Sequence, residues 1–208
     1  MSLAALLVYG LGLALAFGYR SWAQWWATGS TGFVGIREPV LRLGWWGGVL
    51  FILSIALTVA APVLELTGIT PAALSPMAVG LVLAVAGLIL TLAAQTAMGA
   101  SWRVGVDAGE RTDLVTTGIF GRVRNPVFSA MVVALAGLPL LVPTWVSVAA
   151  LVSLVAAVEI QVRVVEEPYL ARVHGTAFTS YTARTGRFVP KVTPTARRGS
   201  PEPPSAHR

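Results

Sequence analysis

The chain has 208 residues, of which 55% are hydrophobic and only 12% are charged, with a mean hydropathy of +0.74. Soluble domains carry about 25% charged residues, so this composition excludes an ordinary soluble domain and indicates a membrane protein. Because cysteine is absent and there are only two histidines, neither a disulfide framework nor a histidine-rich metal site is expected. The net charge of +6 is attributed to the basic loops of a membrane protein and not to a nucleic-acid partner.

Five apolar segments are predicted to cross the membrane as helices: 3–17, 44–66, 76–98, 127–141 and 144–167. The first ends in Ala14-Leu15-Ala16, which resembles a signal-peptide cleavage site. No basic stretch precedes it, however, and a retained span is expected. The long run 127–158 contains Pro139 and Pro143, which interrupt helices, so it is interpreted as two helices in a tight hairpin. The fold class is therefore expected to be all-α, a polytopic membrane helical bundle.

The basic residues alternate between the loops that these segments leave. Three lie in the first loop, none in 67–75, four in 99–126, none in the hairpin turn and eight from Arg163 onward. The positive-inside rule then places the N-terminus outside and the C-terminus in the cytoplasm, and we expect a bacterial cytoplasmic membrane. The expected organisation is three N-terminal helices in 1–98, a core in 99–193 and a proline-rich, disordered tail in 194–208.

Charged residues recur near the end of the last predicted helix. Glu159, Arg163 and Glu167 are spaced i, i+4 and i+8, and Glu166 lies seven residues after Glu159, so all four are predicted to share one helix face. Two interpretations remain open. The face forms either an ion-pair ladder at the headgroup level or one wall of a polar cavity, because charges that enter a membrane usually face the bundle interior.

Six motifs between residues 99 and 190 resemble the isoprenylcysteine carboxyl methyltransferase family, whose core is related to phospholipid methyltransferases. In chain order they are Ser101-Trp102-Arg103-Val104-Gly105, 114–120 (LVTTGIF), 122–128 (RVRNPVF), 163–170 (RVVEEPYL), 175–181 (GTAFTSY) and 187–190 (RFVP). Each motif is weak alone, but their order around a helical hairpin is specific. The N-terminal helices carry no such signature.

The resemblance implies S-adenosylmethionine as the cofactor and a lipophilic small molecule or lipid as the methyl acceptor, possibly a carboxylate. It implies Arg124 and Glu167 as catalytic residues. Arg124 would bind the carboxylate of the methionyl part or of the substrate, and Glu166 and Glu167 would meet the cofactor's amino group or ribose, or fix Arg124. The implied cofactor-binding residues are Gln95, Val115, Gly118, Phe120, Arg124, Asn125, Glu166, Glu167, Tyr181 and Arg187. For Gln95, a hydrogen bond between helices is an equal alternative.

The sequence departs from the family pattern at several positions. Asn125 stands where the family usually has histidine, and phenylalanine replaces tyrosine at 120, 128 and 178. Asparagine keeps hydrogen bonding but does not titrate near neutral pH, which predicts a divergent member with another substrate. The alternative hypotheses are a non-catalytic membrane protein that binds a lipid or small molecule in the same pocket, and a reductase-like relative, for which no G-x-G-x-x-G is found.

Overall fold

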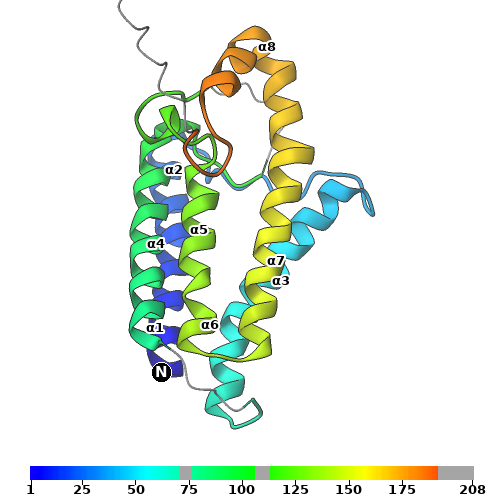
Figure 1. The fold of residues 1–208 in the computed structure, drawn as a ribbon. Helices are drawn as coiled ribbons and strands as arrows, with labels where there is room; N and C mark the ends of the chain where they lie inside the picture. The colour runs from blue at the N-terminus through cyan, green and yellow to red at the C-terminus, as the bar shows by residue number, and fades with distance from the viewer. Residues whose placement is uncertain (71–75, 106–112, 192–208) are drawn as a thin grey trace, which may run out of the picture.

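The computed structural model describes residues 1–70, 76–105 and 113–191. In these ranges the chain forms helices and no strand, with two isolated bridges, which confirms the all-α membrane bundle (Figure 1). Arg111 and the predicted disordered tail lie outside the described residues.

The first membrane helix is longer than predicted. It comprises α1 (Ser2–Leu13), a π-helical turn η1 (Ala14–Tyr19) and α2 (Arg20–Thr28), and so it continues well past residue 17. Gly18 does not interrupt the helix. It ends at Gly29, which takes the left-handed conformation (φ 76°) that glycine adopts without steric cost.

The other predicted segments are helical as well. They are α3 (Leu43–Leu66), α4 (Met77–Ala97), α5 (Pro126–Ala136) with α6 (Leu138–Leu141), and α7 (Trp145–Ile160), which continues through η4 (Gln161–Glu166) into α8 (Glu167–Arg184). Short 3-10 turns follow α4 (η2, Gly99–Ser101) and precede α5 (η3, Gly118–Gly121). The described residues contain four helices long and apolar enough to span a membrane. The hairpin is present, but its first arm, Pro126–Leu141, is shorter than a usual span.

The bundle is built from two helix pairs, α3 with α7 and α4 with α5, and α1 contacts both α3 and α4. Small residues let α4 and α5 approach closely. A Cβ atom added at Gly87 would lie 2.3 Å from the backbone nitrogen of Ala134. Because lipid tails are as apolar as leucine side chains, close backbone packing of this kind is a main source of association between membrane helices.

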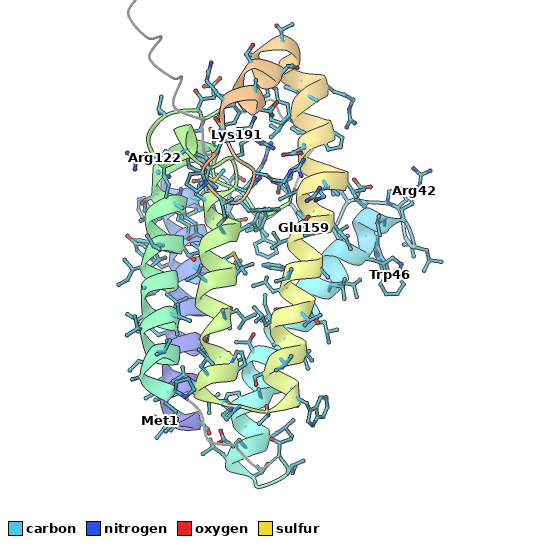
Figure 2. The ribbon with its side chains drawn as sticks, in the orientation of Figure 1. Met1, Arg42, Trp46, Arg122, Glu159 and Lys191 are labelled. Carbon is cyan, nitrogen blue, oxygen red and sulfur yellow. The ribbon has the colours of Figure 1, made fainter. Side chains whose placement is uncertain are left out.

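The loops that carry basic residues gather at the end of the bundle where α8 lies. Arg42, Arg122 and Lys191 lie toward this end, and Met1 lies at the other (Figure 2). The described parts of the turns at the opposite end, 67–70 and 142–144, contain no lysine or arginine. The arrangement therefore agrees with the predicted alternation, and the side of the membrane that each end faces stays a prediction.

Candidate functional site

A cavity of about 680 Å³ lies at the basic end of the bundle, lined by residues of all the long helices and of the segments that connect them. Its volume is typical of small-molecule sites, which occupy about 300–1,000 Å³. Eight of the ten predicted binding residues line it: Gln95, Val115, Phe120, Arg124, Asn125, Glu166, Glu167 and Tyr181. Gly118 and Arg187 are not on its wall.

Glu167 binds two arginines at the edge of this cavity. Its Oε1 accepts hydrogen bonds from Nε and Nη2 of Arg124 at 3.2 and 2.9 Å. Arg187 donates from Nε to Oε1 at 2.9 Å and from Nη2 to Oε2 at 2.6 Å. Multiple hydrogen bonds between guanidinium and carboxylate are among the strongest polar contacts in proteins. Of the roles that the resemblance left open for Glu167, this geometry favours fixing Arg124.

Arg124 also donates hydrogen bonds to backbone carbonyls at the C-terminal end of α8. Its Nη1 donates to the carbonyl oxygens of Thr185 and, at 3.4 Å, of Thr182. With Nε and Nη2 directed at Glu167, most of its five N–H donors already have acceptors within the protein. A two-point grip of Arg124 on a ligand carboxylate would therefore require some of these bonds to be exchanged.

The segment after α8 folds back along the start of α5 and brings Arg187 to Glu167. The backbone nitrogen of Arg124 donates to the carbonyl of Gly186 at 2.8 Å, and both the backbone nitrogen and Nδ2 of Asn125 donate to the carbonyl of Arg187, at 3.1 and 3.2 Å. The hydroxyl of Ser129 adds a bond to the carbonyl of Phe188 at 2.7 Å. We call residues 185–188 the C-terminal strap. Asn125 therefore anchors this strap as well as lining the cavity.

The carboxylate of Glu167 raises the pKa of Arg187 above the ordinary arginine value, chiefly through the hydrogen bonds between them. A raised folded-state pKa stabilises the protein at every pH below the ordinary value, and the effect is lost only as the pH rises through the still higher folded value. The charge of Arg187 therefore persists throughout the range in which proteins are normally studied.

A π-helical turn alters the predicted charge ladder. Arg163 pairs with Glu159, four residues earlier, as the spacing predicted, and both side chains are exposed. Between Gln161 and Glu166 the helix widens to the π form, and Nε2 of Gln161 donates to Glu166 five residues on, at 3.4 Å. The expectation that all four charges share one face is corrected accordingly, because the widened turn rotates the residues after it. Glu166 and Glu167 line the cavity, and Glu159 and Arg163 do not.

Aromatic side chains form much of the remaining wall. The hydroxyl of Tyr181 donates to the carbonyl of Phe120 at 2.6 Å, which ties α8 to the turn before α5. The guanidinium of Arg103 lies over the ring of Tyr169, 5.7 Å from its centroid, and both residues line the cavity with the buried Trp102. All three residues belong to motifs noted in the sequence, Trp102 and Arg103 to 101–105 and Tyr169 to 163–170, although Tyr169 was not among the predicted binding residues.

Gln95 forms a hydrogen bond between two helices, which is one of the two roles predicted for it. Its Nε2 donates to the carbonyl of Ala16 in η1 at 3.1 Å. Nearby, Nη2 of the buried Arg20 donates to the carbonyl of Gly99 at 2.7 Å, and its guanidinium lies over Trp102. These contacts fasten the first helix to the end of α4. The Oε1 of Gln95 is buried and has no hydrogen-bond partner in the described part of the chain.

The sequence did not indicate that the N-terminal half lines the cavity. The segment between α2 and α3 pairs with the segment after α4 through Val34 N to Val104 O (3.0 Å) and Val104 N to Gly32 O (2.8 Å). Both segments contribute to the wall, and α3 supplies much of its apolar part, with Leu13 of α1 and Phe17 of η1. The arginines of this loop indicated its side of the membrane, and nothing in its sequence indicated a ligand site.

The arrangement brings carboxylates, guanidinium groups and aromatic rings together at the inner end of a membrane bundle. Among the described residues, no group of three or more histidine, cysteine, aspartate or glutamate side chains could hold a metal ion. Comparison with known proteins matches residues 75–177 to the family model described as phospholipid methyltransferase, which is related to isoprenylcysteine carboxyl methyltransferases. Neither a curated protein nor a solved structure matches the chain.

Proposed function

We propose, on the premise that residues 75–177 are a phospholipid methyltransferase domain, that this protein transfers a methyl group from S-adenosylmethionine to a lipophilic acceptor at the membrane surface. The observation that carries the proposal is the cavity itself. It places the charged motifs of this domain, Arg124 with Glu166 and Glu167, beside a continuous apolar wall inside a membrane bundle. A methyl donor and a lipophilic acceptor could therefore meet there.

The residues of the cavity suit the cofactor. S-adenosylmethionine has an ammonium group, a carboxylate, a sulfonium and an adenosine part, and the wall offers acidic, basic and aromatic side chains within one volume. Glu167 is engaged by Arg124 and Arg187, whereas the hydrogen bond that Glu166 accepts within the described residues is a long one, from Gln161 at 3.4 Å. We therefore assign the cofactor's amino group or ribose to Glu166, and the positioning of Arg124 to Glu167.

The cofactor supplies a methyl group that its sulfonium already activates, and the methyl passes to a nucleophile on the acceptor as its bond to sulfur breaks. The protein's part is then to align the two molecules and exclude water. Trp102, Tyr169 and Tyr181 are 3–4% exposed and form a rigid aromatic wall for this purpose. Asn125 supplies hydrogen bonding without a titrating group, so an acceptor that needs deprotonation would have to lose its proton elsewhere.

Calorimetry of the detergent-purified protein with S-adenosylhomocysteine tests the cofactor assignment. Glu166→Gln is expected to weaken binding roughly tenfold, because a hydrogen bond to a charged group contributes about 1.5–3 kcal/mol. Glu159→Gln is the matched control, since Glu159 lies on the same helical segment, outside the cavity, and should bind like the unsubstituted protein. If the unsubstituted protein gives no heat of binding, the methyltransferase assignment fails and a non-catalytic binding protein becomes the better description.

A further inference from the structure

A second, smaller cavity of about 70 Å³ lies deeper in the bundle, and we call it the inner chamber. It shares five wall residues with the large cavity: Leu13, Phe17, Phe51, Ile55 and Met131. Along the first membrane helix its lining continues from Phe17 in η1 to Tyr9 in α1, eight residues, or about 12 Å of helix. The two cavities therefore adjoin, and together they mark a path from the charged end toward the middle of the membrane.

The inner chamber offers an occupant no hydrogen-bond donor, because the hydroxyl hydrogens on its wall are already bonded. Each of its four polar side chains donates its hydroxyl to a backbone carbonyl at 2.7–3.0 Å: Tyr9, Ser54, Thr58 and Thr91. The remaining lining is aliphatic, aromatic or glycine. A cavity of this kind does not hold water well, and it takes apolar molecules instead. The chemistry of the chamber therefore selects hydrocarbon.

Gln95 marks the change from polar to apolar lining along α4. Its buried Oε1 is an acceptor without a partner in the described chain, and it lies on the wall of the large cavity. One turn further along the helix, Thr91 is already part of the inner chamber, with its hydroxyl bonded to the carbonyl of Gly87. Among the described residues, a ligand that follows this path meets an acceptor without a partner at Gln95, and beyond it mainly carbon and hydroxyl groups that already donate to backbone carbonyls.

The far end of the path is closed where α1 meets α4. Gly12 allows Leu88 to pack against α1, since a Cβ atom at Gly12 would lie 2.6 Å from Cδ2 of Leu88. Tyr9 is held beside them by its 2.7 Å hydrogen bond to the carbonyl of Ala134. At about 70 Å³ the chamber is smaller than the cavity of roughly 150 Å³ that accepts a benzene molecule, and it therefore holds the end of one chain only.

We propose that the methyl acceptor is a single-chain amphiphile that places a hydrogen-bond donor at Gln95 and the end of its hydrocarbon chain in the inner chamber, where Tyr9 and Leu88 limit its length. This inference rests on the proposed function, because it names the acceptor class of the same cavity. It disfavours a two-chain phospholipid as the acceptor, since the inner chamber has room for the end of one chain and a second chain would have to lie elsewhere.

Photo-crosslinking of the full-length protein in detergent with S-adenosylhomocysteine tests the location of the chain. The probes are dodecylamine and dodecan-1-ol with a diazirine on the terminal carbon, because both head groups can donate a hydrogen bond to Gln95. Crosslinks are expected at Tyr9 and Gly12 on α1 and at Leu88 on α4. Leu7 and Leu11 lie on the exposed face of the same helix and report the detergent-facing surface. Crosslinks confined to Leu7 and Leu11 would overturn the proposal.

Chain-length selectivity supplies the second measurement, made as competition by octyl, dodecyl and hexadecyl compounds for the crosslinked site. Leu88→Ala enlarges the closed end and is expected to favour longer chains, by about fourfold for each added methylene, or about 0.8 kcal/mol. Met131→Phe narrows the junction of the two cavities and is expected to favour shorter chains. Ile89→Ala removes an exposed aliphatic side chain from the same helix and should leave the length preference unchanged. Identical length profiles in all variants would contradict the assignment.

The two proposals fail in different ways. If S-adenosylhomocysteine binds but the chain probes do not reach the chamber, the acceptor class is wrong and the methyltransferase proposal stands. If the probes reach the chamber while S-adenosylhomocysteine gives no heat, the methyltransferase proposal fails and the cavity is a chain-binding site. Competition by a two-chain phosphatidylethanolamine as strongly as by the single-chain compounds would overturn the single-chain inference alone.

Discussion

The carboxylate of Glu167 lies between two guanidinium groups, and it is the anion that allows them to approach the same site. Glu167→Gln removes this charge and leaves Arg124 and Arg187 facing each other across a neutral amide. Because the side chains of Arg124 and Glu167 are only 12% and 16% exposed, solvent compensates little, and we expect a loss of about 1.5–3 kcal/mol in unfolding free energy.

Thermal unfolding in detergent micelles measures this effect. Glu159→Gln is again the matched control, because its partner Arg163 is 54% exposed and Glu159 itself 40%, and exposed ion pairs contribute about 0–1 kcal/mol. Equal unfolding midpoints for the two variants would mean that the pair of arginines does not depend on Glu167.

At the scale of single residues, the sequence predicted eight polar and apolar residues that the structure brings to the wall of one cavity, and their role in binding stays a prediction. Charges at the end of a membrane helix are costly, so Glu166 and Glu167 stood out without any structure. The role of Arg187 was harder to predict, because Arg187 binds Glu167 from the C-terminal strap and does not line the cavity. The apolar wall could not be predicted, since a leucine that faces lipid and one that faces an internal cavity give the same hydropathy.

At the scale of structural elements, the path of the C-terminal strap requires a glycine at position 186. A Cβ atom at Gly186 would lie 1.8 Å from the carbonyl oxygen of Val189, so Gly186→Ala must displace the strap. Arg187 moves with it and loses its position beside Glu167. We expect a lower unfolding midpoint and faster proteolysis between residues 184 and 191.

Gly10→Ala is the control for this substitution, because no atom lies within 4 Å of its added Cβ and α1 is helical there. It should leave both readouts unchanged or slightly improve stability, since alanine favours helix by about 1 kcal/mol over glycine. A Gly186→Ala protein as stable and as resistant to protease as Gly10→Ala would show that the strap tolerates the extra methyl group.

The positions of the helices followed from hydropathy, but their local form did not. Both π-helical turns, η1 and η4, contribute residues to the large cavity, Phe17 from the first and Gln161 with Glu166 from the second. Such turns insert one residue into the helical repeat, and they are often found at functional sites. A prediction that assumes 3.6 residues per turn therefore places the residues on either side of the turn on one face, as it did for Glu159 and Glu167.

For the whole molecule, the distribution of charge predicts its orientation. The basic loops share one end of the bundle, and the positive-inside rule assigns that end to the cytoplasm. A reporter fused after Pro190 is expected to read cytoplasmic, and one fused after Gly68, in the loop that contains no arginine, to read external. Two reporters on the same side would contradict the arrangement of helices described above.

The walls of the large cavity come mainly from two parts of the chain, one that matches a known family and one that precedes the match. Arg124, Glu166 and Glu167 lie within residues 75–177, which match a known family, whereas the charged Arg37 and Glu38 line the same cavity from outside that match. The helices α1 and α3, which bound the inner chamber together with α4, α5 and α7, also precede the match. Under the proposed function, changes in the apolar residues of α1 and α3 are expected to alter which acceptor enters, while Arg124, Glu166 and Glu167 stay in place. A chimaera that joins the first two membrane helices of one such protein to residues 75–177 of another is then expected to exchange their acceptors.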